Sequence, residues 1–462
     1  MDRAHKKRME TVKLIITETI MVVAVVFTVI LLTFIAMGYN LNKNGELGQS
    51  GLVQIRSLPT GATITIDGDT ILAKTNTSRL LSAGEHTIKL TRDGYDSWEK
   101  TITSEPGRLL KMEYARLFYQ DRTPEQVAEM SGEVEFFVSA PNRDFVIVVL
   151  KNNNKWIYYD LRGDGTEKTE LDLTEIMKDL TPIEIAWDQN SDKVLVKTLH
   201  KNETEWLVIN VKNVKNSVNL TKEFAMNFTD VQFATDNGDK LYALENGNLR
   251  AIATNEKTVS QVMASDVKKY AFANSDLLYL TNARKLALYQ TDSDDIEVAQ
   301  FGEADGLINI EMSEYIGQKY LTMTVGKTMK VYRGGYPTEN DKLSEMELIL
   351  DKEIGFEPAT LKERTEGELL VAKDDKKIAV FNAENSILYS YELENSNMFM
   401  VDDYLFGTIV DGKLFVRDFD GTNKREITSA SSNAFITKNG KWLYYLNTKD
   451  GKTVLIREQI IN

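Results

Sequence analysis

An uncharged run of 19 residues near the N-terminus constrains this chain more than any other feature. Residues 19–37 read TIMVVAVVFTVILLTFIAM. A helix rises about 1.5 Å per residue, so this run nearly crosses the hydrocarbon core of a bilayer, which is about 30 Å thick. The apolar residues 14–16 extend the stretch beyond Glu18, whose carboxylate would then lie near the headgroups. The sequence therefore predicts a transmembrane helix at residues 14–38.

Two other readings of this run compete with the membrane anchor. A buried helix of a soluble protein is rarely this long and this uniformly apolar. A cleavable signal peptide usually has an apolar core of about 7–15 residues that ends at an A-x-A-like site. Here the run is longer and is followed by Gly38-Tyr39-Asn40, and a lipoprotein-type cleavage site is impossible because the chain has no cysteine. We therefore expect an uncleaved anchor.

Charges beside the run predict how the helix is inserted. Residues 1–13 contain five Lys or Arg and two Asp or Glu, a net charge of +3, whereas the whole chain carries -14 and the remainder therefore -17. Basic flanks stay in the cytoplasm. We expect a cytoplasmic tail at residues 1–13, one crossing of the cell membrane, and everything after about Tyr39 outside the cytoplasm.

Composition narrows the classes of function. With 42% hydrophobic and 27% charged residues, the 462-residue chain is ordinary globular material and long enough for several domains. Its acidity argues against nucleic acid as a partner, because nucleic-acid affinity comes largely from Lys and Arg at phosphates. The absence of cysteine excludes disulfides, thiol nucleophiles and Cys-ligated zinc. A chain of this size without disulfides outside the cytoplasm is more typical of a bacterial envelope than of eukaryotic secretion.

A compact β pattern follows a polar, Gly-containing linker at residues 39–51. Alternating runs at 53–55, 63–66, 86–90 and 100–103 predict strands, and Asp67-Gly68 predicts a hairpin turn. The segment also contains four characteristic motifs: PTGA (59–62), IDG (66–68), LSAGEH (81–86) and GYDSW (94–98).

Together these motifs resemble the PEGA domain, named for a Pro-Glu-Gly-Ala turn in which Thr60 here replaces Glu. The resemblance implies a small PEGA-like β-sandwich at residues 52–117, of a kind common in bacterial and archaeal envelope proteins, and it implies no catalysis. The matching residues read as structural, with Gly61 and Gly94 at positions that need positive φ and with Tyr95 and Trp98 in a small core.

The remaining residues predict short strands separated by polar turns. Residues 118–132 read as a connector with one helical turn, and a β-propeller-like domain is expected at 133–462. Strand-starting runs recur about every 40 residues, the length of a four-stranded propeller blade. These runs lie near Phe136, Ile185, Val231, Tyr270, Tyr315, Leu369, Phe399 and Phe435.

The repeated units share an aromatic strand, a polar Asp/Asn/Gly turn and then a Lys-aliphatic strand. They are similar to the blades of a TolB-type or WD-like propeller, whose repeats read S-P-D-G-K-x-L-A-F and D-x-D-G-x-x-x-R-x-L-T. Residues 412–446 fit this pattern well, 183–245 fit partly and 300–365 fit poorly. The resemblance implies seven or eight blades, and an array of β-sandwiches is the alternative architecture.

Few residues supply catalytic chemistry. The chain has three histidines: His5 in the predicted tail, His86 on a predicted strand, where packing explains it, and His200 in a polar loop. None lies in a context typical of a Ser/His/Asp triad, and a histidine metal site is equally poorly supplied. Asp418-x-Asp420-Gly421 lacks the full spacing of a calcium loop, so a turn explains it more simply.

We therefore expect a mostly β protein with no catalytic, cofactor-binding or metal-binding residue and no cofactor. The five tryptophans would stack sugars in a polysaccharide site, but core packing explains them more simply. The function predicted is a non-catalytic, membrane-anchored, extracytoplasmic binding or scaffold protein of the cell envelope, whose propeller loops bind a protein or polysaccharide. One alternative is a sensor subunit that needs a partner, because a tail of about 13 residues is too short for an output domain. The other is a carboxylate-dependent propeller glycosidase.

Overall fold

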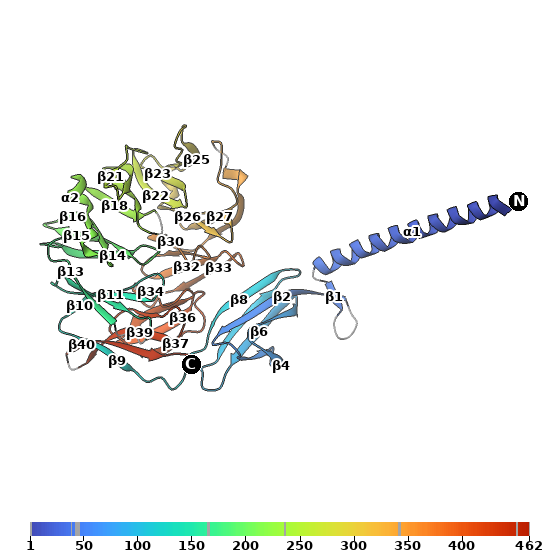
Figure 1. Ribbon diagram of the computed structural model, residues 1–462, viewed down its shortest axis with the longest axis horizontal. Coiled ribbons are helices and arrows are strands. Elements are labelled where there is room, and N and C mark those ends of the chain that lie inside the picture. The colour runs from blue at the N-terminus through green and yellow to red at the C-terminus, as the bar shows by residue number, and fades with distance from the viewer. Residues whose placement is uncertain are drawn as a thin grey trace. The chain divides into compact units, whose positions relative to one another are not determined.

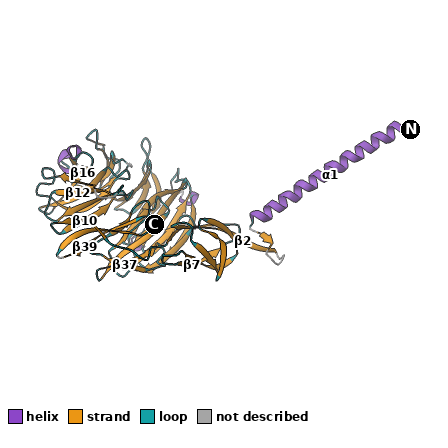
Figure 2. Ribbon diagram, turned by 60° about the horizontal axis from the view of Figure 1, so that its bottom comes forward, coloured by secondary structure: helices purple, strands orange, loops and turns teal. Residues whose placement is uncertain are grey.

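The computed structural model describes residues 2–37, 39–41, 47–163, 167–234, 237–340, 343–449 and 451–461. These residues form two compact units, Met1–Gln120 and Asp121–Asn462. Strands make up most of Asp121–Asn462, whereas Met1–Gln120 combines a long helix, Asp2–Ala36, with eight strands (Figures 1 and 2). The predicted mostly β fold is confirmed.

Helix α1 (Asp2–Ala36) contains a segment, Lys13–Ile35, that is long and apolar enough to cross a membrane. Every side chain from Lys13 to Ile35 is exposed, so the reading of a helix buried in a soluble core is wrong. The hydroxyl groups of the threonines donate to carbonyl oxygens one turn earlier, which satisfies them without water. These threonines are Thr17, Thr19, Thr28 and Thr33. Gly38, the predicted end of the span, lies outside the described residues.

Two four-stranded sheets follow the helix. The first has the order β1 (Tyr39–Leu41), β2 (Leu47–Leu58), β5 (Thr77–Ser82), and β8 (Leu109–Arg116) also pairs with β2. The second has the order β4 (Asp69–Lys74), β3 (Thr63–Ile66), β6 (Gly84–Thr91), β7 (Trp98–Ser104). Their inward faces bury Val53 and Ile55 from the first sheet and Ile64, Ile88 and Trp98 from the second, all without exposed surface. This is the predicted small β-sandwich.

Turn residues of this sandwich have the backbone that the sequence predicts. Asp67 and Gly68 both have positive φ, +52° and +90°, as a two-residue turn of type I′ between β3 and β4 requires. Gly61 and Gly94 also have positive φ, +82° and +78°. The predicted linker at 39–51 differs, because β1 and the start of β2 pair there, with Tyr39 opposite Gln49. Residues 42–46 of that linker lie outside the described part.

In the second unit, the described residues form eight further four-stranded antiparallel sheets. Seven of them take their four strands consecutively from the chain: β10 (Val134–Ser139), β11 (Phe145–Leu150), β12 (Lys155–Asp160), β13 (Glu167–Asp172); β14 (Thr181–Trp187), β15 (Lys193–His200), β16 (Glu203–Asn210), β17 (Val218–Asn219); β18 (Phe228–Phe233), β19 (Lys240–Glu245), β20 (Asn248–Ala253), β21 (Thr258–Val259); β22 (Val267–Ala273), β23 (Asp276–Thr281), β24 (Lys285–Leu288), β25 (Ile296–Gln300); β26 (Ile308–Tyr315), β27 (Gln318–Val325), β28 (Thr328–Arg333), β29 (Glu347–Glu353); β30 (Thr360–Arg364), β31 (Leu369–Lys373), β32 (Lys377–Asn382), β33 (Ile387–Glu392); β34 (Met398–Met400), β35 (Leu405–Val410), β36 (Lys413–Asp418), β37 (Arg425–Ser429). The eighth, which we call the closing sheet, consists of β38 (Ala434–Ile436), β39 (Trp442–Lys449), β40 (Lys452–Gln459) and β9 (Glu125–Met130). Four short helices lie in loops: η1 (Val214–Asn216), α2 (Leu220–Phe224), η2 (Glu303–Asp305) and η3 (Leu343–Glu345).

A repeated hydrogen-bonding pattern explains the polar turns between first and second strands. Asp188 Oδ1 accepts from the backbone N–H groups of Asp192 (2.8 Å) and Lys193 (2.9 Å). Asp402 Oδ1 accepts in the same way from Leu405 (2.7 Å). An Asp side chain thus takes the place of a backbone acceptor and folds the chain back into the next strand.

Neighbouring sheets pack face to face through apolar side chains. Ile147 of the β10–β13 sheet and Val196 of the β14–β17 sheet belong to one buried cluster. The β10–β13 sheet also packs against the closing sheet, where the rings of Phe137 and Phe435 lie 5.5 Å apart within another cluster. Four-stranded sheets packed in a closed ring form a β-propeller, which confirms the predicted fold. The sequence left seven or eight units open, and the described residues form eight such sheets.

The predicted strand positions agree with this arrangement except at one place. Seven of the eight lie in the first strand of a sheet, whereas Leu369 lies in a second strand, β31. Strand β30 reads TLKER with only Leu361 buried, while β31 reads LLVAK with four buried residues. The apolar pattern therefore identified the buried strand of that sheet and missed its polar neighbour.

Residues 118–132 differ more from the prediction of a connector with a helical turn. Residues 125–130 form β9, which pairs with β40 so that Ala128 lies opposite Leu455 (Figure 1). Two ion pairs flank the pairing, Lys452–Glu129 at 2.6 Å and Arg457–Glu125 at 2.8 Å. The partner strand is more than 300 residues away, so no local pattern reveals this strand.

Proline in β9 tests the role of ring closure. We expect Ala128→Pro to lower the free energy of unfolding of residues 47–462 by about 2–3 kcal/mol, because the ring fixes φ and distorts an edge strand that has one partner. Urea unfolding measures the loss. Glu129→Gln is the control, and it should cost less than about 0.5 kcal/mol because its ion pair is exposed. Equal stability of Ala128→Pro and the unmodified chain would show that β9 does not hold the ring.

Candidate functional site

The β-sandwich brings together a serine, a histidine and an aspartate that the sequence did not connect. His86 lies on β6, Asp67 in the turn between β3 and β4, and Ser82 at the end of β5. His86 Nδ1 is 2.6 Å from Asp67 Oδ2, and His86 Nε2 is 3.2 Å from Ser82 Oγ and 2.8 Å from the Ser82 carbonyl oxygen. Asp67 also accepts a hydrogen bond from the backbone N–H of Thr87 at 2.8 Å.

A catalytic triad has the same two side-chain contacts on its histidine, but there Nε2 is unprotonated and takes the serine proton. In this protein the nearest neighbour of Nε2 is a carbonyl oxygen, which only accepts hydrogen bonds, so Nε2 carries a proton. Asp67 favours a proton on Nδ1 as well. Both contacts therefore favour the protonated, imidazolium form of His86, which links the two sheets.

The pKa values agree with this description. Partial burial opposes the charged form of His86, but the hydrogen bonds to Asp67 and Ser82 outweigh it and raise the pKa of His86 above its ordinary value. The hydrogen bond from His86, together with that from Thr87, lowers the pKa of Asp67. The arrangement thus works as a charged clamp.

The clamp predicts a pH-dependent stability of the sandwich. A raised folded-state pKa means that the stabilisation is complete below about 6.5 and is lost as the pH rises through the raised value. We expect His86→Ala to cost residues 47–120 about 1–2 kcal/mol at pH 5.5 and clearly less at pH 9. Urea unfolding at the two pH values measures the difference.

Ser82→Ala is the matched control for this clamp. It removes the hydroxyl group but keeps the carbonyl oxygen, so its effect should stay within about 0.5 kcal/mol at both pH values. A cost of His86→Ala that is the same at pH 5.5 and pH 9 would contradict the charged clamp.

The other candidate residues have structural partners. His200 ends β15, and its Nδ1 lies 2.9 Å from the carbonyl oxygen of Asp179. Asp418 ends β36 and Asp420 lies in the turn that follows, where Asp420 Oδ1 accepts from the backbone N–H (3.1 Å) and hydroxyl (2.7 Å) of Thr422. Among the described residues, no three His, Cys, Asp or Glu side chains are grouped to hold a metal ion.

Most tryptophans are packing residues. Three are buried: Trp98, Trp156 and Trp206. Trp187 is partly buried and donates its indole N–H to a backbone carbonyl at 3.3 Å. Trp442 is covered by Arg457, whose guanidinium carbon lies 4.4 Å from the ring centroid. All five indoles are buried or partly buried, so none is a ready platform for a sugar.

A charged cluster lies on three first strands of the propeller, and we call Lys268, Lys269, Glu311 and Lys362 the first-strand cluster. Lys269 Nζ on β22 donates to the Ile308 carbonyl oxygen (3.0 Å) and to Asn309 Oδ1 (2.6 Å) on β26. Both acceptors are neutral. Partial burial, followed by the nearby charges of Lys268 and Lys362, lowers the pKa of Lys269. The three lysines of this cluster outnumber its one glutamate, which favours an anionic ligand.

Glu311 on β26 is the one carboxyl group of this cluster. Burial is the main cause that raises the pKa of Glu311 to about 7; the charge of Lys362 opposes the rise, and that of Glu363 contributes to it. A carboxyl group that titrates near neutral pH is a feature of general acids. The sequence carries no signal for it, because Glu311 occurs in an ordinary strand pattern and only the neighbouring sheets bury it.

The raised pKa of Glu311 predicts a second pH effect. The folded protein keeps this carboxyl protonated where the unfolded chain loses the proton, so stability falls as the pH rises from about 4.5 to about 7. We expect Glu311→Gln to raise the free energy of unfolding by about 1–3 kcal/mol at pH 8 and to change it little at pH 4.5. Glu135→Gln, on an exposed position of first strand β10, is the control and should have equal effects at both pH values. A Glu311→Gln effect independent of pH would contradict the prediction.

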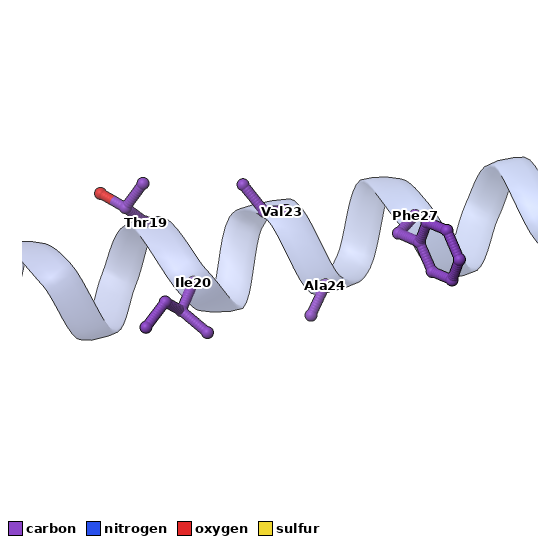
Figure 3. Close-up of a pocket in the computed structure, with 5 residues that line it drawn as sticks. All are labelled: Thr19, Ile20, Val23, Ala24 and Phe27. Carbon is purple, nitrogen blue, oxygen red and sulfur yellow. The ribbon is translucent and has the colours of Figure 1, made fainter.

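Helix α1 has a shallow hollow on its surface (Figure 3). Its lining is apolar apart from one hydroxyl: Thr19, Ile20, Val23, Ala24 and Phe27. That hydroxyl already donates to the Ile15 carbonyl oxygen at 2.7 Å. The hollow therefore offers contact for lipid chains or another apolar surface and no recognition of a polar ligand.

Comparison with known proteins adds one family and several structural likenesses. No curated protein matches the sequence. Among solved structures, a prolyl endopeptidase is similar over 72% of this chain and 55% of its own, with 12% identity and a TM-score of 0.45. Dipeptidyl peptidase 4 of Porphyromonas gingivalis is similar over 72% of this chain and 58% of its own, with 11% identity and a TM-score of 0.46. The β-propeller domain of Cps50 from Myceliophteria thermophila is similar over 72% of this chain and 100% of its own, with 12% identity and a TM-score of 0.39.

This chain spans a little more than half the length of the two peptidases. The model of the PEGA domain matches residues 50–116. Those residues include the PTGA, IDG, LSAGEH and GYDSW motifs and coincide with the two-sheet sandwich. Residues 50–116 are therefore a PEGA domain.

Proposed function

We propose that this protein is a membrane-anchored, extracytoplasmic binding protein that presents a β-propeller to a ligand and catalyses no reaction. One observation carries the proposal. Helix α1 ends at Ala36, and β1 begins at Tyr39 and pairs at once with β2 of the PEGA domain. Only two residues thus separate the membrane-length helix from the first paired strand. Such a short connection suits an anchor that remains in the mature protein, whereas a cleaved leader does not require it.

The proposed orientation places residues 1–13 in the cytoplasm. Its support is their charge of +3 beside a helix with an uncharged run of 19 residues. Tyr39, the first residue of β1, has its ring 5.3 Å from that of Phe34 near the end of the helix. Aromatic residues of this kind are enriched where a helix leaves the membrane.

Binding is favoured over catalysis by the chemistry of the groups present. Asp67 and the Ser82 carbonyl oxygen both favour the protonated form of His86, which is not the form that accepts a proton from a serine. The first-strand cluster favours a ligand with acidic groups, such as an acidic protein segment or an acidic polysaccharide. Among these the proposal favours a protein, because the indole rings that would stack sugars are covered.

Glu311 supports a second candidate, the carboxylate-dependent glycosidase. A glycosidase needs an acid with a raised pKa and a second carboxylate beside it, and Glu311 meets the first requirement with Glu363 nearby. Hydrolysis of a glycoside by residues 47–462 that Glu311→Gln abolishes and Glu135→Gln preserves would replace the binding proposal.

The absence of native cysteine makes the topology directly testable. Single cysteines at Ala4 in the tail, at Leu72 in the PEGA domain and at Ser431 in the propeller report where each part lies. The side chain of Leu72 is fully exposed and that of Ser431 is exposed. With a membrane-impermeant maleimide on intact cells, we expect labelling at positions 72 and 431, and labelling at position 4 only after permeabilisation.

The same variants separate an anchor from a cleaved leader. If the leader were removed, the mature protein would carry no label at position 4 even after permeabilisation. Labelling of position 4 in intact cells, with positions 72 and 431 protected, would reverse the proposed orientation.

A further inference from the structure

Three leucines lie side by side on the first sheet of the PEGA domain, and we call them the leucine row. Leu52 on β2 is directly opposite Leu80 on the antiparallel strand β5 and is also the partner of Leu109 on the parallel strand β8. Their side chains are 38%, 63% and 46% exposed, respectively. Cross-strand partners on one face are near neighbours, so the three form one continuous apolar stripe.

The stripe belongs to the outward face of the sandwich. Side chains alternate along a strand, and Val53 and Ile55 of β2 and Met112 of β8 fill the core with no exposed surface. Leu52 and Leu109 therefore point away from that core. Isolated exposed leucines are common, but a row across three adjacent strands marks a surface that another apolar phase covers.

The pairing of β1 with β2 fixes where this row lies relative to the membrane anchor. Tyr39, three residues after the end of α1, is opposite Gln49. Leu52 lies three residues beyond Gln49 on the same strand, about 10 Å at 3.3 Å per residue. The headgroup layer of one leaflet is roughly 5–8 Å thick outside the hydrocarbon core. The row is thus within reach of the membrane surface.

Charge separates the PEGA domain from the propeller. Residues 47–117 contain nine Lys or Arg and eight Asp or Glu, whereas residues 118–462 contain 40 and 57. A membrane surface with anionic lipids repels the propeller and does not repel the PEGA domain. Arg56 on β2 lies beyond the row and forms an exposed ion pair with Glu113 of β8 at 3.4 Å, so the face beside the row carries no net charge from this pair.

We infer that the leucine row of the PEGA domain inserts into the headgroup layer of the membrane that α1 crosses. The domain then lies against the bilayer surface and restricts its own tilt relative to the membrane. This inference rests on the proposed membrane anchor. It commits to lipid as the occupant, because strand pairing holds the row next to the point where the chain leaves the bilayer.

An environment-sensitive fluorophore on a single cysteine tests the inference. Ser78→Cys places the label on β5, two residues from Leu80 on the same exposed face, and Leu72→Cys places it on β4 of the other sheet as the matched control. The full chain is reconstituted in vesicles of phosphatidylcholine and phosphatidylglycerol. Nitroxide-bearing lipids quench labels in the headgroup region, and iodide quenches labels in water.

We expect nitroxide quenching at position 78 to exceed that at position 72 about twofold or more, with the reverse order for iodide. Replacing all three leucines with serine should remove the difference. Because these side chains are exposed, the fold should survive, and the comparison of positions 78 and 72 in the otherwise unmodified chain stands without that variant.

Three results separate the possible failures. Equal iodide quenching at both positions, in protein that floats with the vesicles, overturns the inference and leaves the anchor intact. Protection at position 78 without nitroxide quenching, increasing with the protein-to-lipid ratio, overturns it in favour of a second copy as occupant. Protein that does not float with the vesicles at all contradicts the proposed anchor.

Discussion

The pairing of β9 with β40 is the interaction on which the larger part of this protein depends. Each propeller sheet buries its faces only against its neighbours, so the first and last sheets must meet for either to be covered. Strand β9 completes the closing sheet, and the contact of Phe137 with Phe435 seals the ring beside it. Bringing such distant segments together costs loop-closure entropy that grows slowly with length, and the apolar contacts of the whole ring offset it. The chain that leaves the PEGA domain enters the propeller at β9. The segment that connects the two units is therefore followed directly by the strand that completes the closing sheet.

The serine, histidine and aspartate of the PEGA domain show that residue types alone do not determine the role of a site. Ser82, His86 and Asp67 have contacts like those of a hydrolase triad, yet the backbone carbonyl beside Nε2 favours the protonated imidazole. The same residues then stabilise a join between two sheets. Glu311 illustrates the opposite case, since an ordinary glutamate acquires a pKa near 7 from burial between sheets. Function at either place depends on surroundings that no short motif describes.

Three parts with different charge follow one another along the chain. A helix long and apolar enough to cross a membrane comes first, a nearly neutral domain follows it, and the acidic propeller comes last. An anionic surface would repel the acidic propeller. The near-neutral charge and the leucine row of the PEGA domain are the features on which its proposed contact with lipid rests.

The sequence by itself determined the features that depend on neighbouring residues. The uncharged run of residues 19–37 predicted the helix, and the motifs around Gly61 and Asp67-Gly68 predicted the sandwich, because turns and alternation are set by neighbouring residues. Tertiary structure alone decided what depends on distant partners. The sequence of β9 resembled a connector, and the polar strand β30 was missed. Both strands have weak alternation of apolar residues and are held in place by pairing with other strands. The clamp of His86, the raised pKa of Glu311 and the leucine row all join side chains from separate strands, and only the folded sheets place those strands side by side.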